Sequence, residues 1–402
     1  MSTTSAPNPT HQMQRFDFTL YTQGVEGAIQ GENRMELRPS HWRGWLRSWT
    51  LRFLLGVMSE TNAKIVLENL FGTIESTADK KHRKGCVRVH LLPKRTGDPW
   101  GELSKQSEKT PDFYIWKGQI QISAPKDILG TILLPIIKIA ASVGGVGRGW
   151  RRPLHFFVKP DSKRKFSRGT HLILTRVGGS SPYPMSLDPV DWKSLYNQWT
   201  IAVQTKWGDR GTPEHLSAEV FSPETCAVYA VPGPTEEPID FDGTQSHYGT
   251  QKTSSSMALT RGIRPGQQQA RATTEAKQNR SQTIQWNTSS STQTRGQGMN
   301  LIYSTRESAP PRDYKGNVNV GGRAASGGSK SSFCSWVSIR RVDQPHSEAK
   351  TDCQEIVCLF LGKQEAQGFN RDRLQFLRDL EQIETSQHLF GMRVSSQPEQ
   401  VR

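Results

Sequence analysis

Hydrophobic and polar positions alternate through residues 15–22, with Phe16, Phe18 and Leu20 on one face. A period of two is typical of a strand with one buried face, so the chain is expected to open with a strand. Over residues 39–56 the apolar positions change to helical spacing, three or four residues apart. Pro39 and Ser40 provide the chemistry of a helix start, and Gly56 ends the pattern. This pattern predicts a helix whose tryptophan ridge is buried against a sheet.

The patterns that follow predict a second helix over residues 60–70, strands over 85–92 and 114–123, and an apolar helix over 127–142. The apolar helix contains a proline and a lysine and is shorter than the roughly 20 residues that cross a bilayer, so we interpret it as buried. The order strand, helix, strand, strand, helix resembles a split β-α-β unit, a sheet covered on one face.

After residue 160 the elements begin again. The pattern predicts strands over 171–177, 226–232, 333–342 and 353–361, a helix over 192–206, and a final helix that Asn370 caps. These pieces fit a second domain of similar construction. We therefore expect an α+β protein of two domains, residues 1–160 and 161–402.

Residues 243–330 differ in composition from the rest of the chain. They are rich in Ser, Thr, Gln and Gly, and they carry 12 Lys and Arg against 3 acidic residues, hence a charge of +9. A segment this polar buries little surface by itself. It is predicted to be either a flexible insertion in the second domain or an arm that orders on a polyanion.

The whole chain is basic, with 52 Lys and Arg against 37 acidic residues and a formal charge of +15. This excess favours a polyanionic partner, either nucleic acid or an anionic membrane surface. The first residues contain no charged start followed by an apolar run, so we expect a cytoplasmic protein.

Five scattered cysteines argue against a disulfide framework. A zinc site from Cys334, His346, Cys353 and Cys358 can be imagined. The last two, however, are an odd number apart within one predicted strand and so face opposite sides of it. We therefore favour buried thiols and expect no metal and no cofactor.

Candidate binding chemistry gathers in residues 142–153, directly after the apolar helix. Glycines there would let a polyanion approach the bare backbone amides. The alternative is a plain loop in which glycine ends the helix. Nearby basic residues favour phosphate binding. The candidates are Gly144, Gly145, Gly147, Arg148, Arg151 and Arg152, and Lys163 and Arg164 extend the basic stretch.

The helix over residues 39–56 offers a second set of candidates. Arg43 and Arg47 are four apart and point the same way, so each could hold a phosphate bidentately. Arg52 follows near the end of the same helix. In the alternative interpretation these arginines only solvate the outer face of an amphipathic helix.

Three of these landmarks resemble the RAMP superfamily of CRISPR type III effector complexes, in particular the head subunits of the Cmr complex. The first family helix has the pattern Pro-Ser-x-Lys/Arg-Gly-x-x-Arg. Pro39, Ser40, Arg43, Gly44 and Arg47 resemble it, with one more residue between Ser40 and Arg43 than the pattern has, and Trp49, Arg52 and Gly56 continue the likeness. Leu-Phe-Gly-Thr at 70–73 resembles a family turn. Gly-Gly-Val-Gly at 144–147, with the arginines after it, resembles the family's glycine-rich loop, although Pro153 stands where that loop usually continues with glycine.

The resemblance implies two tandem ferredoxin-like domains, related to the RNA recognition fold, with the glycine-rich loop lying along RNA. It also implies a non-catalytic subunit of a ribonucleoprotein in antiviral defence. Such a subunit would hold guide RNA (crRNA) and target RNA by backbone contacts, beside other RAMP subunits, while base pairing reads the sequence.

Two other functions stay open. Some RAMP proteins resemble metal-free endoribonucleases that cut precursor guide RNA, and His41 and His82, with Tyr21 near either, are the available acid and base candidates. Ordinary surface imidazoles would give the same pattern. A membrane-surface role would use the Trp/Arg helix as an interfacial anchor, but the strands predicted on either side of it favour a protein without a membrane partner.

Overall fold

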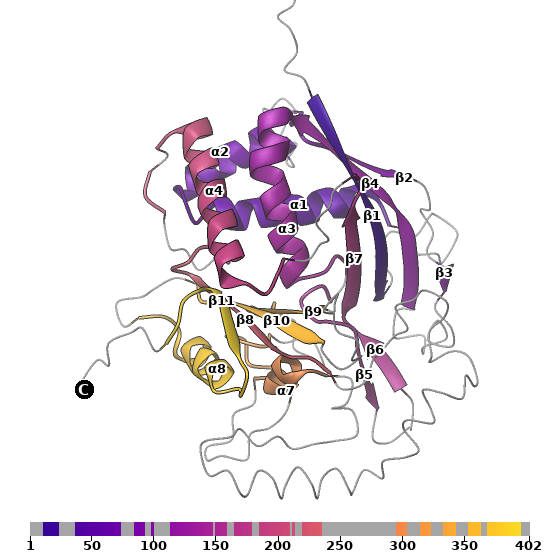
Figure 1. The fold of residues 1–402 in the computed structure, drawn as a ribbon, viewed down its shortest axis with the longest axis vertical. Coiled ribbons are helices and arrows are strands. Elements are labelled where there is room, and N and C mark those ends of the chain that lie inside the picture. Colours follow the sequence, from indigo (N-terminus) through magenta and orange to yellow (C-terminus); the bar gives the residue numbers. More distant parts are fainter. Residues whose placement is uncertain are drawn as a thin grey trace, which may run out of the picture.

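The computed structural model describes residues 11–23, 37–73, 84–92, 98–99, 113–147, 149–158, 165–178, 185–209, 211–213, 219–234, 295–303, 314–322, 333–342, 353–362 and 368–394. Helices lie between two sheets that come from successive parts of the chain, and further helices cover the second sheet (Figure 1). Among the described helices, none combines the length and the apolar character that crossing a membrane requires.

The first sheet is built from β1 (His11–Gln23), β2 (Arg88–Leu92), β4 (Phe113–Pro125) and β7 (Thr170–Arg176), with the two-residue β3 (Asp98–Pro99) beside β4. The order across the sheet is β7-β1-β4-β2, and all neighbours are antiparallel.

Two helical segments connect these strands. The helices α1 (Pro39–Leu54) and α2 (Glu60–Phe71) follow β1. The π-helical turn η2 (Ile128–Leu133) continues into α3 (Leu134–Val143) after β4. Helices after the first and third strands, with the strand order four-one-three-two, define a ferredoxin-like unit.

The second sheet repeats this plan. Its strands β8 (Cys226–Pro232), β9 (Val337–Val342), β10 (Gln354–Phe360) and β11 (Gln387–Gly391) have the order β11-β8-β10-β9 and are antiparallel throughout. The helix α7 (Gln297–Tyr303) follows β8, and α8 (Arg371–Glu381) follows β10. The prediction of two tandem ferredoxin-like domains is therefore confirmed.

The position of β7 differs from the sequence prediction. The pattern assigned residues 171–177 to the second domain, but β7 pairs with β1 through seven residues, from Phe16 opposite Arg176 to Thr22 opposite Thr170. It is the fourth strand of the first sheet. We propose to place the division between the units after Arg176 rather than after residue 160. A hairpin of β5 (His155–Val158) and β6 (Lys165–Arg168) precedes β7, and α4 (Pro189–Trp207) follows it.

The central strands of the second sheet are buried on both faces, and β8 and most of β10 are accordingly continuous apolar runs. Alternate residues of β8 and β10, such as Val228 and Cys358, lie in the same core as α1, α3 and α4. The residues between them, such as Tyr229 and Val357, pack with α7 and α8 in a separate core. The helices α1, α3 and α4 thus lie between the two sheets, and one core joins the units.

The helix α1 has the buried tryptophan ridge that its spacing predicts. Trp42, Trp49 and Phe53 are at most 1% exposed. Pro39 is the first helical residue, as expected, but Arg38 and not Ser40 is the N-cap. The backbone N–H of Arg38 donates to Nδ1 of His41 at 3.0 Å. Because the indole rings lie in the protein core, they are not available to insert between lipid headgroups.

The helix α7 was missed by the sequence analysis. It lies inside residues 243–330, the segment predicted to be an insertion, yet Met299, Leu301 and Ile302 are buried. Of that segment, the parts other than 295–303 and 314–322 lie outside the described residues. The final helix α8 has the predicted cap, since Oδ1 of Asn370 accepts hydrogen bonds from the first turn.

Candidate nucleic-acid interface

The glycine-rich loop begins where α3 ends and is closely packed. Residues 144–146 are buried. The N–H of Gly144 donates to Ala140 O at 3.2 Å, and the N–H of Gly145 donates to Trp150 O at 2.9 Å. The hypothesis of bare amides is therefore wrong for these two residues, because the fold itself uses their donors. Gly147 and Gly149 have φ angles of 92° and 77°, a backbone region that favours glycine.

Arg43 and Arg47 point the same way, as their spacing predicts, but their partners are protein carbonyls. Arg43 donates to Phe71 O, and Nη1 of Arg47 donates to Gly72 O at 2.9 Å. These carbonyls end α2, where the negative end of the helix dipole attracts a cation. The first helix motif and the turn at 70–73 therefore contact each other directly.

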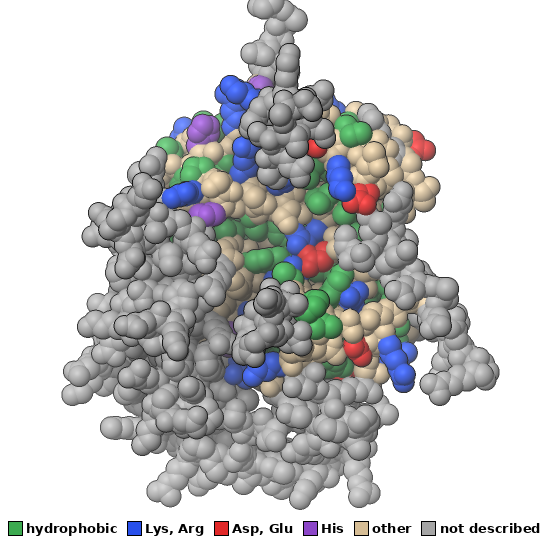
Figure 2. All heavy atoms as spheres, turned by 180° about the vertical axis from the view of Figure 1, so that it is seen from behind, with side chains coloured by type: hydrophobic (Ala, Val, Ile, Leu, Met, Phe, Trp, Pro, Cys, Tyr) green, Lys and Arg blue, Asp and Glu red, His purple; other side chains and the backbone are tan. Residues whose placement is uncertain are grey.

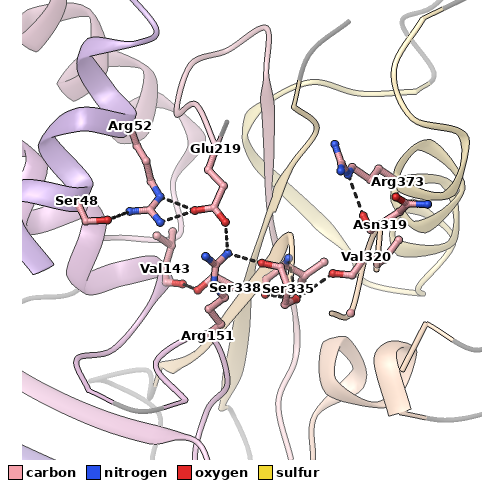
Figure 3. A network of polar contacts seen from close by, with 12 residues as sticks. Ser48, Arg52, Val143, Arg151, Glu219, Asn319, Val320, Ser335, Ser338 and Arg373 are labelled. Atoms are coloured by element: carbon pink, nitrogen blue, oxygen red, sulfur yellow. Dashed lines mark hydrogen bonds and ion pairs between the residues drawn. The ribbon is translucent and has the colours of Figure 1, made fainter. Parts of the chain in front are cut away.

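Arg52 lies on another side of α1 and joins it to the segment before β8. Its Nε donates to Oε2 of Glu219 at 2.8 Å, and its guanidinium also pairs with Ser48 (Figure 3). The guanidinium carbon lies 5.3 Å from the centroid of the Trp150 ring, a cation–π contact. Burial lowers the pKa of Arg52, and the Glu219 carboxylate opposes that shift.

Arg151 meets the same carboxylate from the glycine-rich loop. It pairs with Oε1 of Glu219 and donates to Ser335 O in the second unit (Figure 3). Its guanidinium carbon is 4.5 Å from the centroid of the Trp150 ring. Burial by itself would raise the pKa of Glu219, but Arg52 and Arg151 together hold that pKa below its ordinary value.

The guanidinium group of Arg152 is buried against the second unit. Its guanidinium donates to Val337 O at 2.6 Å, to Ser335 Oγ at 2.8 Å and to Gly321 O at 3.2 Å. Burial lowers its pKa. Arg152 therefore fastens the loop to the second unit, and in this arrangement its donors point at protein acceptors rather than at a surface ligand.

Two cavities open along α1 and share Ser48 and Arg52 in their walls; we call them together the α1 groove. The first has a volume of about 430 Å³ and the second about 370 Å³. The first is lined by Ser40, His41, Gly44, Trp45, Ser48, Trp49, Arg52, Val146, Gly147, Trp150 and Arg151. The second is lined by Ser48, Leu51, Arg52, Leu55, Glu219, Val318, Phe333, Cys334 and Trp336. The helix α1 and the glycine-rich loop thus meet in the first cavity, but neither Arg43 nor Arg47 is among the residues that line it.

The wall of the α1 groove suits a ligand with both charge and flat apolar surfaces. The charge comes from Arg52 and Arg151, and the apolar surface comes from tryptophan side chains that line the first cavity. The indole N–H groups of Trp45 and Trp49 have no acceptor within the described chain, but both nitrogen atoms are buried and are not available to a ligand. On the face opposite to that of Figure 1, Lys and Arg side chains lie next to hydrophobic ones among the described residues (Figure 2).

Four of the candidate binding or catalytic residues are untested, and another contacts a residue that was not expected. Arg148, Lys163, Arg164 and His82 lie outside the described residues. The ring of Tyr21, expected near a candidate histidine, packs instead against His171 at a centroid distance of 6.0 Å.

The cysteines expected to be buried thiols fall into two classes. Cys353 and Cys358 are buried, but Cys334 is exposed on the α1 groove. Sγ of Cys353 accepts from Nε of Arg341 at 2.9 Å, whereas Cys358 lies in the core with α1. Within the described ranges no three metal-binding side chains come together.

Sequence reasoning missed Glu219 and Trp150 as members of the site. Trp150 stands inside the quoted basic loop, so an aromatic between arginines was a usable signal. Glu219 precedes Val220 and Phe221, and no motif in the surrounding sequence indicates a functional role for it. Only the tertiary fold brings it between two arginines that are 99 positions apart in sequence.

No family model and no curated protein matches the sequence. Among solved structures, the chain is similar to the apo form of Cmr1 from Pyrococcus furiosus, with a TM-score of 0.43 and 10% sequence identity. The alignment covers 94% of this chain and 99% of that chain.

Proposed function

We propose that this protein is a non-catalytic RNA-binding subunit of a type III CRISPR ribonucleoprotein, which holds guide RNA and target RNA by their backbones in antiviral defence. The observation that carries the proposal is the α1 groove. In it, two sequence motifs about a hundred residues apart meet and place the guanidinium groups of both Arg52 and Arg151 next to the Trp150 ring.

The chemistry of this groove fits a single strand of RNA better than a small metabolite. Guanidinium groups bind phosphates bidentately, so the arginines of the groove can hold a strand by its backbone without reading its sequence. Base pairing between the two RNAs would then supply specificity. The formal charge of +15 adds long-range attraction for a polyanion.

The proposal predicts a salt-sensitive RNA affinity that depends on Arg151. The probe is a fluorescently labelled single-stranded oligouridylate, and its binding to the full chain is followed by anisotropy over a range of salt concentrations. Arg151→Ala is expected to weaken binding about ten-fold and to make log Kd less dependent on salt, because at least one phosphate contact is lost. The matched control is Arg378→Ala, which removes an exposed arginine of α8 that does not line the groove.

Equal losses in the two variants would contradict the role of the groove, and absence of RNA binding by the wild-type chain would reject the function. The biological assignment needs a second measurement. RNA that co-purifies with the tagged protein from its native cells is sequenced, and discrete repeat-derived fragments are expected.

One observation supports the alternative function, an endoribonuclease that cuts precursor guide RNA. The His41 ring lines the α1 groove. We expect no cleavage of repeat RNA by the wild-type chain. Cleavage that disappears in His41→Ala, while oligouridylate binding is retained, would favour the enzyme instead.

A further inference from the structure

Glu219 is in an unusual position for an acidic residue in a groove that is otherwise suited to anions. Its two carboxylate oxygens divide between two cations, Oε2 facing Arg52 and Oε1 facing Arg151 (Figure 3). It is the only acidic residue among the described residues that line the two cavities.

The three side chains are largely withdrawn from water, with exposed fractions of 11% for Arg52, 13% for Arg151 and 15% for Glu219. Both guanidinium groups also contact the Trp150 ring, so their positions are set by an aromatic surface as well as by the carboxylate. Two arginines held in this way are preorganised for an oxyanion that offers one oxygen to each.

A phosphodiester offers the same pair of anionic oxygens as a carboxylate. The segment that carries Glu219 is anchored independently of this side chain. The N–H of Phe221 donates to Arg52 O at 3.0 Å, and the Phe221 ring stacks on Phe53 at 4.6 Å. The carboxylate can therefore leave its two partners by side-chain rotation while the backbone stays in place.

We propose that Arg52 and Arg151 form a binding site for one phosphodiester of the bound RNA, and that the Glu219 carboxylate occupies this site in the free protein until RNA displaces it. This inference rests on the proposed function and adds a way in which RNA binding is regulated. The carboxylate keeps the two arginines aligned and neutralised, and it weakens binding of any anion that cannot replace it. RNA gains affinity from further contacts along the strand, whereas a single free phosphate has none.

The test is a comparison of two glutamates. Glu219→Gln keeps the size of the side chain and removes its charge, and Glu224→Gln removes one charge from an exposed position five residues away. Anisotropy with the labelled oligouridylate is expected to show about ten-fold tighter binding for Glu219→Gln and little change for Glu224→Gln. In an Arg151→Ala background the gain from Glu219→Gln should largely disappear, because the second cation of the site is missing.

A purely structural ion pair gives a different result. In that case Glu219→Gln lowers the thermal unfolding temperature and leaves RNA affinity equal to that of Glu224→Gln, which overturns the inference while RNA binding by the wild type still supports the proposed function. If Glu219→Gln does not fold, Glu219→Asp replaces it. The shorter carboxylate cannot span both arginines, so tighter binding than wild type is again expected, and unchanged or weaker binding again overturns the inference.

Discussion

Gly145 in the glycine-rich loop and Gly44 in α1 have different structural roles. A Cβ atom built on Gly145 would lie 2.0 Å from Thr170 Oγ1, whereas one built on Gly44 would meet nothing within 4 Å. Gly145 is therefore required by the packing of the loop against β7. Gly44 faces the open α1 groove in the middle of a helix.

Substitution by alanine should separate these two uses. Gly145→Ala is expected to lower the free energy of unfolding by about 1–3 kcal/mol, because Thr170 or the loop backbone must move. Gly44→Ala is expected to raise it by about 0.5–1 kcal/mol, because alanine favours the helix interior. Urea denaturation of both variants measures the difference. A loss of similar size in both would contradict the packing role given to Gly145.

At the residue scale, the sequence predicted the directions of the α1 arginine side chains better than it predicted their partners. Arg43 and Arg47 do share one face of α1, but their acceptors are carbonyls at the end of α2. Arg152 is a plausible phosphate ligand by type and spacing, yet it is buried among carbonyls of the second unit. Periodicity gives the direction of a side chain along its own element, and it contains no information on the element packed opposite.

The helix α7 is held by a single buried carboxylate. Oε1 of Glu355 on β10 accepts from the N–H of Gly296 and Oε2 from that of Met299, both at 2.9 Å. Glu355 is 1% exposed. Burial raises its pKa to about 7, against the opposing effect of these backbone donors and of Arg341.

This pKa predicts how stability changes with pH. Because the folded protein holds the proton more tightly than the unfolded chain, the contribution of Glu355 to the free energy of unfolding is largest at low pH. It falls as pH rises from the ordinary value of 4.5 to about 7. The expected fall is on the order of 1–3 kcal/mol. Urea denaturation at several pH values measures it. Glu355→Gln should flatten the slope, and the exposed control Glu384→Gln should not. An unchanged slope in Glu355→Gln would contradict the assignment.

Strong periodicity made most elements predictable. The strand β1, the helices α1, α2, α4 and α8, and the strands β8 and β10 lie within a few residues of their expected positions. The failures have physical causes. The helix α7 has seven residues in a polar segment, too short for a periodic signal, and Glu355 stabilises it from another strand. The strand β7 was found in the sequence but assigned to the wrong sheet, because strand pairing is a long-range choice.

At the scale of the whole molecule, the two ferredoxin-like units share one core. Trp49 of α1 packs against Phe360 of β10 at a centroid distance of 6.2 Å and against Phe221 at 6.3 Å. Backbone hydrogen bonds also cross between the units, for example from the N–H of Ile339 to Arg151 O at 2.9 Å. Removal of either unit is therefore expected to expose part of the shared core.

The shared core predicts a single unfolding transition. Phe360→Ala removes a ring of the second unit and is expected to cost about 3–5 kcal/mol. Hydrogen exchange should then report the same loss of protection in β1 as in β10. The control Phe376→Ala truncates a ring in the separate core under α8, and its effect is expected to be strongest in the second sheet. Two separate transitions, or a loss confined to β10 in Phe360→Ala, would contradict the shared core.

The double burial of the second sheet also limits how the RNA binding proposed above could take place. Many small RNA-binding domains of related topology lay bases flat across an uncovered sheet, which serves as a stacking platform. Here β8 and β10 have hydrophobic cores above and below them, so no broad surface of that sheet is left for bases. An RNA strand bound to this half of the protein would therefore contact the edges of the sheet and the connecting loops instead of a sheet face.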